Sequence, residues 1–397
     1  MNRLKQKGFR VALFLKTKGG YGREIVTGIC DYLRSTRLIW DMLLHEDFRC
    51  SPEGIRSWTG DGIIADFDDP EIEAALRGTT MPVVAVGGSY HRRSDYPKGM
   101  PYVATDNQKL VEAAFQHLVE MGLSRFALYS MPPLETNRWA LEREKAYSDL
   151  IERDGLEPAI FRGRSTYGPD WDAILGDLVC WLKSLPKPIG VIAVSDARAR
   201  QVLQACIVAA ISVPEEVALV GIDNDPLLKQ LTRISISSVR QGTCMMGLIA
   251  AELLHRRLLG EAISNAPVLV PPEGISAQIS SRHEPVYDPY VMRALHYIRQ
   301  FTAQGVKVAQ VADYVGVSRT TLETHFRKQF GHSVHEEMLD FKLRMAKDML
   351  AAPEASCADV AGKCGFTSLQ YMYAVFRREV GCTPRQFQLD RDRRLSA

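Results

Sequence analysis

Near its C-terminal end the chain carries residues that recur at a fixed spacing suited to DNA recognition. A small residue, a glycine and a hydroxyl residue return 49 positions later: Ala312, Gly316 and Ser318, then Ala361, Gly365 and Thr367. The small side chain lets two helices cross closely, the glycine ends the first helix in a left-handed conformation, and the hydroxyl caps the next helix. This is the helix-turn-helix pattern, whose second helix enters the major groove. The sequence therefore predicts two such units, joined by a helix over 334–351.

The exposed side chains of the two second helices are the candidates for contact with DNA. Contacts to bases are predicted for Ser318, Arg319, Thr320, Glu323 and Thr324 in the first unit, and for Ser368, Leu369, Gln370 and Tyr373 in the second. Contacts to phosphate, which set affinity rather than sequence preference, are predicted for Arg327, Arg377 and Arg378. The alternative for each of these residues is a solvated surface side chain.

The charge distribution indicates that this C-terminal part meets a polyanion. The net charge of the 397 residues is +2. From Asp288 onward, 16 Lys and Arg stand against 12 Asp and Glu, which leaves +4; the preceding residues carry 33 against 35, which leaves −2. A basic small part attached to a weakly acidic large part predicts double-stranded DNA as a partner.

The chain shows no sign of a membrane partner. No run approaches the ~18 apolar residues of a membrane span. The basic N-terminus leads into only a short apolar run without a small-residue cleavage site, so we expect a cytoplasmic location.

The first 280 residues alternate between short apolar runs and helical patterns. Strands are predicted at 9–15, 62–65, 83–86, 125–129, 190–194, 217–222 and 267–271. Helices are predicted between them at 22–35, 107–121, 135–153, 170–184, 196–210 and 242–259. Apolar strands that alternate with helices form parallel sheets covered on both faces. We expect an α/β sensor of two doubly wound lobes that binds a small ligand at the carboxyl ends of its strands, followed by an all-α domain.

These patterns divide the chain into two domains. The effector-binding domain is predicted at 1–280, with lobes at about 8–104 plus 240–263 and 105–238 plus 266–278. An aperiodic linker is predicted at 281–289, and the DNA-binding domain at 290–397.

No set of residues in the chain suits catalysis. The glycines of Gly19-Gly20-Tyr21-Gly22 lack the Gly-Lys-Ser/Thr end of a nucleotide loop. His332 and His335 lack a third metal ligand, and the cysteines lack zinc spacing. Because no general base is paired with a nucleophile or metal, we expect no enzyme activity, no cofactor and no metal site.

Residues 288–390 resemble the AraC-type family of transcription regulators. The resemblance is carried by Val317-Ser318, Phe326-Arg327-Lys328 and Gly331 in the first unit, and by Gly365-Phe366, Phe376-Arg377-Arg378 and Gly381-Cys382-Thr383-Pro384-Arg385-Gln386-Phe387 in the second. It implies that each unit reads one of two successive major grooves. Where many members place a recognition-helix arginine, this chain has Thr324 and Ala374, so readout of guanine is not implied there.

The residues before the linker resemble the sensors of LacI-type regulators and the periplasmic sugar-binding proteins. The resembling segments are Asp61-Gly62-Ile63-Ile64, Thr105-Asp106-Asn107, Val194-Ser195-Asp196-Ala197, 213–224 and 237–241. LacI-type chains carry a DNA-binding headpiece before the first strand, whereas here that strand begins near Phe9. The DNA-reading function is therefore expected at the other end of the chain.

The combination of the two parts resembles the xylose-operon regulators of bacteria. The closest segments are 62–69, 86–91, Arg138-Trp139-Ala140, 196–200 and 368–371. This resemblance implies a transcription activator of pentose catabolism and transport genes that responds to D-xylose and acts with RNA polymerase, and LacI-like sensors commonly pair as homodimers. Repression by steric block and response to another sugar are the alternatives.

The resemblance to sugar binders also indicates the ligand contacts. A neutral polyol needs fixed donors and acceptors for its hydroxyls and an apolar plate for its C–H face. The candidates are Lys16, Tyr21, Asp66, Phe67, Asp68, Arg143, Ser195, Asp196, Asp223 and Gln241, with Trp139 as the stacking ring. Asp196 could instead cap the helix that begins at 197, as Asp106 is expected to cap the helix at 107, and Trp139 could belong to the core.

Overall fold

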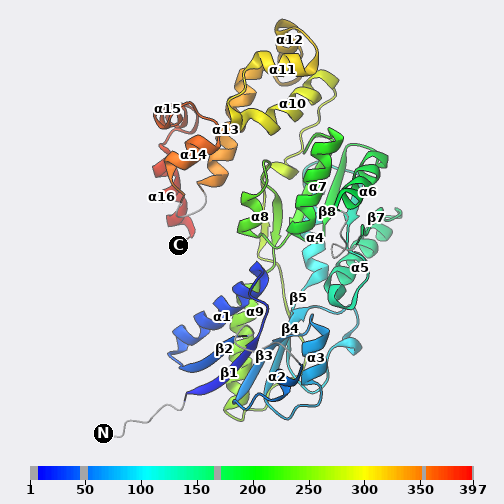
Figure 1. Ribbon diagram of the computed structural model, residues 1–397, viewed down its shortest axis with the longest axis vertical. Helices are drawn as coiled ribbons and strands as arrows, with labels where there is room; N and C mark the ends of the chain where they lie inside the picture. The colour runs from blue at the N-terminus through cyan, green and yellow to red at the C-terminus, as the bar shows by residue number, and fades with distance from the viewer. Residues whose placement is uncertain (1–7, 45–51, 165–170, 351–354, 396–397) are drawn as a thin grey trace.

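The computed structural model describes residues 8–44, 52–164, 171–350 and 355–395. Figure 1 shows three parts in succession: a first α/β lobe, a second α/β lobe, and a helical domain that follows the second lobe. Each lobe is built on one six-stranded sheet. The predicted fold class is therefore confirmed.

The first lobe is built on a parallel sheet in the order β11-β5-β4-β3-β1-β2. Its strands are β1 (Phe9–Phe14), β2 (Trp40–Leu44), β3 (Gly62–Asp66), β4 (Val83–Gly88), β5 (Tyr102–Thr105) and β11 (Val268–Val270). Its helices are α1 (Gly20–Thr36), α2 (Pro52–Arg56), α3 (Pro70–Leu76) and α9 (Thr243–Leu258), with a 3-10 turn η2 (Arg93–Asp95). Residues 11–14 of β1 are all buried, as the continuous apolar run predicts for a strand covered on both faces.

Helices α1 and α9 cross at very short range on one face of this sheet (Figure 1). A Cβ atom at Gly28 would lie 1.8 Å from the carbonyl oxygen of Cys244. A Cβ atom at Gly247 would lie 2.0 Å from the carbonyl oxygen of Ile25. Only glycine allows this approach, which ties the late helix α9 to the N-terminal lobe.

The second lobe is built on a sheet in the order β12-β10-β9-β8-β6-β7. Its strands are β6 (Phe126–Tyr129), β7 (Ile160–Phe161), β8 (Ile189–Ala193), β9 (Val217–Ile222), β10 (Ser237–Arg240) and β12 (Gly274–Ser276). Its helices are α4 (Asn107–Glu120), α5 (Arg138–Arg153), α6 (Trp171–Ser184), α7 (Asp196–Ala209) and α8 (Pro226–Gln230), with 3-10 turns η3 (Glu135–Asn137) and η4 (Ile279–Ser281). Among the described strands of this sheet, only β12 runs antiparallel to its neighbour. Asp106 caps α4, as predicted.

Three segments cross between the lobes. The chain passes from β5 to α4, from β10 to α9, and from β11 to β12. One detail corrects the predicted lobe boundaries: 268–270 form β11, which pairs parallel with β5 in the first sheet, so the segment 266–278 is shared between the lobes.

The helical domain contains both predicted helix-turn-helix units. Its helices are α10 (Pro289–Phe301), α11 (Val308–Val315), α12 (Arg319–Phe330), α13 (Val334–Met349), α14 (Cys357–Lys363), α15 (Leu369–Val380) and α16 (Pro384–Leu395), with a 3-10 turn η5 (Thr302–Gln304). Gly316 and Gly365 have φ values of 83° and 72°, in the left-handed region that favours glycine. Ser318 caps α12 as predicted, but Ser368, not Thr367, caps α15, because the second turn is one residue longer.

The predicted linker at 281–289 is shorter than expected, because α10 already begins at Pro289 with Asp288 as its cap. The apolar face of α10, which includes Val291 and Leu295, lies in one continuous core with Ile211 and Val213 of the second lobe. The helical domain is therefore packed on the second lobe.

The glycine crossing of α1 and α9 yields a stability prediction. Gly247→Ala should lower the free energy of unfolding by ~1–3 kcal/mol, since the added methyl group forces two backbones apart. Gly176→Ala is the matched control on α6, where an added Cβ meets nothing within 4 Å. It should raise stability by ~0.5–1 kcal/mol. Denaturant unfolding measures both changes, and equal effects would contradict the close crossing.

Candidate ligand cleft and nucleic-acid interface

A cavity of about 480 Å³ lies between the two lobes. Its lining combines residues of α1 and of the ends of β3, β4 and β5 with residues of α5, α7, the end of β9 and the crossing before α9. The lining residues are Tyr21, Asp66, Asp68, Gly88, Thr105, Met131, Trp139, Arg143, Ser195, Ala197, Arg198, Gln201, Asp223 and Gln241. The carboxyl ends of parallel strands thus meet at the cavity, as expected for this fold.

On the first-lobe side, Asp66 is the last residue of β3. Burial raises its pKa to about 7, and the charge of Asp68 acts in the same direction. The backbone N–H of Asp68 donates to Asp66 Oδ1 at 3.0 Å and opposes this rise. Burial also raises the pKa of Tyr21 well above its ordinary value, and its buried hydroxyl has no hydrogen-bond partner among the described residues. The first-lobe side therefore presents the Asp66 carboxyl group and the Tyr21 hydroxyl to the cavity.

On the second-lobe side, Asp223 follows β9 in an unusual backbone conformation. Its φ is 123°, a value that L-residues rarely adopt and that the surrounding structure must impose. Burial raises its pKa to about 6, while Arg143 and Gln241 oppose the rise. The Gln241 amide donates to Asp223 Oδ1, which holds the carboxylate at the cavity wall.

Arg143 is the polar centre of the second-lobe wall and is only 3% exposed. It donates to Asn107 Oδ1 and Gln241 Oε1, each at 3.0 Å, and to a backbone carbonyl, and it lies 3.9 Å from Asp223. Its guanidinium also lies 4.8 Å from the centroid of the Trp139 ring. These contacts hold Arg143 and Trp139 in place in the cavity wall.

Arg198 and Gln201 of α7 line the cavity but were not predicted from the sequence, and neither was Thr105 at the end of β5. Arg198 Nη1 donates to Tyr129 Oη at 2.7 Å and to Gln201 Oε1 at 2.9 Å. Its buried Nη2 has no hydrogen-bond partner among the described residues. The available signal was the one-turn spacing of these two residues after the cap Ser195, which places them on one face of α7.

Three predicted contacts, Lys16, Phe67 and Asp196, lie outside the lining of the cavity and stay predictions. Lys16 is paired with Asp69 at 2.7 Å. Phe67 is 3% exposed and belongs to the core of the first lobe. Asp196 accepts hydrogen bonds from the Ser238 hydroxyl and from the backbone N–H of Asp225. The residue that caps α7 is Ser195, not Asp196.

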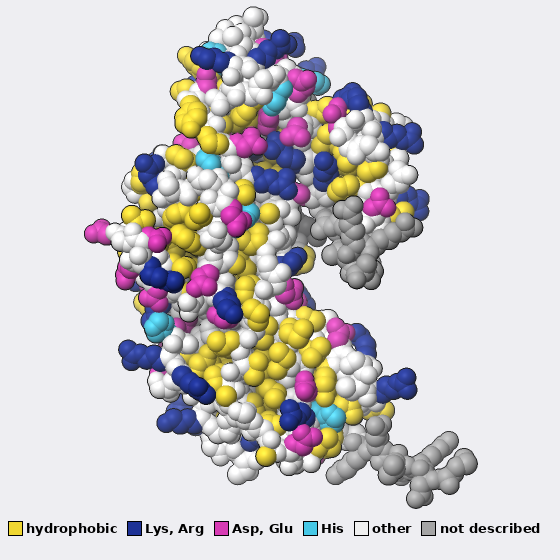
Figure 2. All heavy atoms as spheres, turned by 180° about the vertical axis from the view of Figure 1, so that it is seen from behind, with side chains coloured by type: hydrophobic (Ala, Val, Ile, Leu, Met, Phe, Trp, Pro, Cys, Tyr) yellow, Lys and Arg dark blue, Asp and Glu magenta, His cyan; other side chains and the backbone are white. Residues whose placement is uncertain are grey.

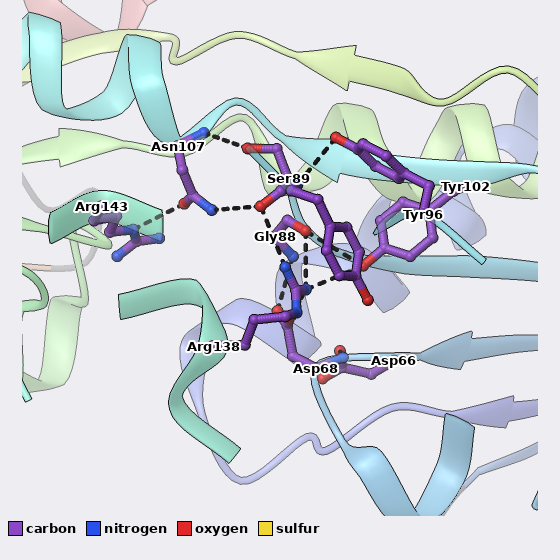
Figure 3. Close-up of polar contacts among 10 residues, drawn as sticks. Asp66, Asp68, Gly88, Ser89, Tyr96, Tyr102, Asn107, Arg138 and Arg143 are labelled. Atoms are coloured by element: carbon purple, nitrogen blue, oxygen red, sulfur yellow. Dashed lines mark hydrogen bonds and ion pairs between the residues drawn. The ribbon is translucent and has the colours of Figure 1, made fainter. Parts of the chain in front are cut away.

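A second feature that the sequence did not reveal joins the lobes beside the cavity. Arg138, the first residue of α5, reaches from the second lobe to the Asp68 carboxylate, the carbonyl oxygens of Gly88 and Ser89, and Tyr102 Oη (Figure 3). Its guanidinium lies 3.7 Å from the centroid of the Tyr90 ring. Asp68 is therefore held by a residue of the opposite lobe.

The helical domain presents most of the predicted DNA contacts to solvent. Those exposed are Ser318, Arg319, Thr320, Thr324, Arg327, Ser368, Gln370, Arg377 and Arg378. Three predicted residues are placed differently. Glu323 accepts from the backbone N–H of Val334 at 3.1 Å, and Leu369 and Tyr373 pack partly on the core around α15. Their contacts with DNA stay predictions.

The described residues hold neither a membrane-spanning helix nor a cluster of three side chains suited to a metal ion. The cavity instead alternates carboxylates with guanidinium, amide and hydroxyl groups around an aromatic ring. Such a lining suits a neutral ligand rich in hydroxyl groups.

Comparison with family models divides the chain into three matched regions. Residues 10–108 match the XylR N-terminal domain, residues 115–278 match a periplasmic binding protein-like domain, and residues 311–390 match a helix-turn-helix domain.

Similar proteins cover nearly the whole chain. The xylose operon regulatory protein of Escherichia coli (strain K12) is 41% identical over 382 residues, which are 96% of this chain and 97% of that protein. The xylose operon regulatory protein of Haemophilus influenzae is 40% identical over 96% of this chain and 98% of that protein. A solved structure of a xylose-binding transcription activator superposes with a TM-score of 0.88 at 40% identity, over 96% of this chain and 98% of that one.

The elevated pKa of Asp66 predicts a pH dependence of stability. An unfolded Asp loses its proton near pH 4, whereas folded Asp66 keeps it up to about pH 7. Between these values the folded state binds more protons, so the free energy of unfolding falls as pH rises. Asp66→Asn should remove ~2 kcal/mol of this fall, after allowance for partial exposure.

Urea unfolding between pH 4 and 8 measures the effect. Asp154→Asn, on an exposed residue, is the control and should keep the wild-type pH profile. A wild-type profile in the Asp66 variant would show that this carboxyl is not buried as described.

Proposed function

The chain belongs to the family of xylose operon regulatory proteins, and on this premise we propose that it is a transcription activator that responds to D-xylose. Membership makes it a DNA-binding transcription regulator and not an enzyme. What remains to be tested is the sugar, the direction of regulation, and the residues that carry each step. The proposed targets are genes of pentose uptake and breakdown.

The observation that carries the proposal is the cleft between the lobes. Its volume of about 480 Å³ leaves room for a single small sugar and its ordered water. Asp66 and Asp223 face it from opposite lobes and would accept hydrogen bonds from ligand hydroxyls. Tyr21 and Arg198 each have a donor without a partner among the residues that the structure describes. Trp139 offers the apolar plate. A sugar held this way contacts both lobes at once and so favours one relative position of the two.

DNA binding would use the exposed starts and basic residues of α12 and α15. Gln370 is exposed and could pair with adenine through its amide, while Arg327 and Arg377 would lie on phosphates. The two helices belong to the two units of one chain, so a monomer would read two successive major grooves.

We propose further that the regulator works as a homodimer and contacts RNA polymerase. Large apolar side chains such as Leu227, Met245 and Leu269 are 47–57% exposed and offer surface for self-association. A dimer would hold four recognition helices, and pairing makes binding of the second domain to DNA effectively intramolecular.

The pocket assignment is tested at Asp223. Asp223→Ala removes an acceptor for sugar hydroxyls and should weaken D-xylose binding by ~1.5–3 kcal/mol, the range for hydrogen bonds to charged groups. Isothermal titration calorimetry measures the affinity. Asp149→Ala, on the exposed face of α5, makes the same change away from the cleft and should bind as the wild type does. Wild-type affinity in the Asp223 variant would refute this pocket, and preference for another pentose would correct the sugar.

The DNA surface is tested by salt dependence. In the double variant Arg327→Gln/Arg377→Gln, the slope of log affinity against log salt should fall by ~1 for each lost phosphate contact. Arg125→Gln/Arg153→Gln removes the same charge from exposed residues of the second lobe and is the control. Equal slopes in the two double variants would place the DNA on another surface.

A further inference from the structure

A second cavity, of about 200 Å³, lies where the helical domain meets the second lobe. Its walls come from α7, the loops around 211–213 and 231–234, and α10. The lining residues are Arg200, Leu203, Gln204, Cys206, Ile207, Ile211, Val213, Leu231, Thr232, Arg233, Ile234, His296, Arg299 and Gln300. It shares no lining residue with the interlobe cleft.

The charged residues that line this second cavity, which we call the junction cavity, are all arginines. Arg200, Arg233 and Arg299 line it from three different elements, and none of the described lining residues is acidic. Figure 2 shows dark-blue Lys and Arg side chains gathered where the helical domain meets the second lobe. The carboxylate of Glu215 is paired with Arg299 Nη1. The three arginines differ in environment: Arg299 is buried and paired with Glu215, Arg200 is partly buried, and Arg233 is exposed and lies over the Phe301 ring.

Hydrogen bonding in the junction cavity is incomplete. Arg200 Nε and Arg299 Nε are buried and have no hydrogen-bond partner among the described residues. A buried, unsatisfied donor is costly, and more so when it carries charge. Water would satisfy these N–H groups. An anion would satisfy them too, and it would also offset the charges of Arg200 and Arg233, which have no ion pair among the described residues.

We propose that the junction cavity is a binding site for a small phosphate-type anion, either free phosphate or a small phosphomonoester. The planar guanidinium fork matches the oxygens of a phosphate group, and the cavity volume limits the ligand to a small molecule. The mostly apolar remainder of the wall, including Leu203 and Ile234, would exclude water from the bound charge. The site does not depend on which sugar occupies the cleft.

The position of the site connects the two cavities through α7. Ala197, Arg198 and Gln201 line the interlobe cleft, and Arg200 and Leu203 of the same helix line the junction cavity. A bound anion would bridge α7 to Arg299 on α10 and so strengthen the docking of the helical domain on the second lobe.

Isothermal titration calorimetry of the full-length protein without DNA tests the proposal. Inorganic phosphate should bind saturably, and Arg200→Gln/Arg233→Gln should weaken that binding by at least ~10-fold, as expected for loss of charge-assisted hydrogen bonds. These two arginines are chosen because neither is paired with Glu215, so the buried ion pair stays intact. Retained sugar binding verifies that the variant folds.

Controls separate this site from the DNA surface and identify the anion. Arg125→Gln/Arg153→Gln removes the same charge elsewhere on the second lobe and should leave phosphate affinity unchanged. D-ribose 5-phosphate binding more tightly than phosphate would identify a phosphomonoester site, and equal affinity would identify free phosphate. Absence of saturable binding, or loss of binding in Arg327→Gln/Arg377→Gln but not in the junction variant, would overturn the proposal.

Discussion

The buried ion pair between Arg299 and Glu215 fixes the relation between the sensor and the DNA-binding domain. The two side chains are 7% and 2% exposed, and they join α10 to the segment that precedes β9. Removing one partner of such a pair leaves a buried charge and costs ~3–5 kcal/mol, so the contact resists separation. Ser212 Oγ, which donates to the carbonyl of Met292 at 3.1 Å, and the apolar core shared with α10 act in the same place. The second lobe and the first helix-turn-helix unit therefore form one packed body.

This constraint determines how a ligand in the cleft can influence DNA. The lobes are joined by three crossing segments and by the contact of Arg138 with Asp68, whereas the second lobe and the helical domain share a core. We therefore expect the two lobes to move relative to each other more easily than the second lobe and the helical domain do. A sugar that bridges Asp66 and Asp223 would change the lobe angle, and the helical domain would move with the second lobe. In a homodimer paired through the sensor, that movement would alter the spacing of the recognition helices relative to two half-sites.

The sequence was informative wherever a local pattern determines structure. Gly316 and Ser318 specified the first turn and cap. The carboxyl ends of β3 and β9, one in each sheet, placed Asp66 and Asp223 where doubly wound lobes bind a ligand. The edge strands β7 and β12, of 2 and 3 residues, are too short to show a pattern. Lys16 lies outside the lining of the cavity and is paired with Asp69. Arg138 was missed because only the packing of the lobes brings it to Asp68. The packing of α10 on the second lobe could not be predicted, because an aperiodic stretch before a helix does not indicate which surface the helix contacts.

The central claim is that the DNA-binding domain moves with the second lobe and not independently of it. Double electron–electron resonance on the full-length protein tests this directly, with spin labels on exposed residues of the first lobe (Lys98), the second lobe (Glu152) and α11 (Asp313). On addition of saturating D-xylose, the distances from Lys98 to Glu152 and to Asp313 should change, while the distance from Glu152 to Asp313 stays constant. A change in the Glu152–Asp313 distance with the interlobe distance unaltered would contradict the account.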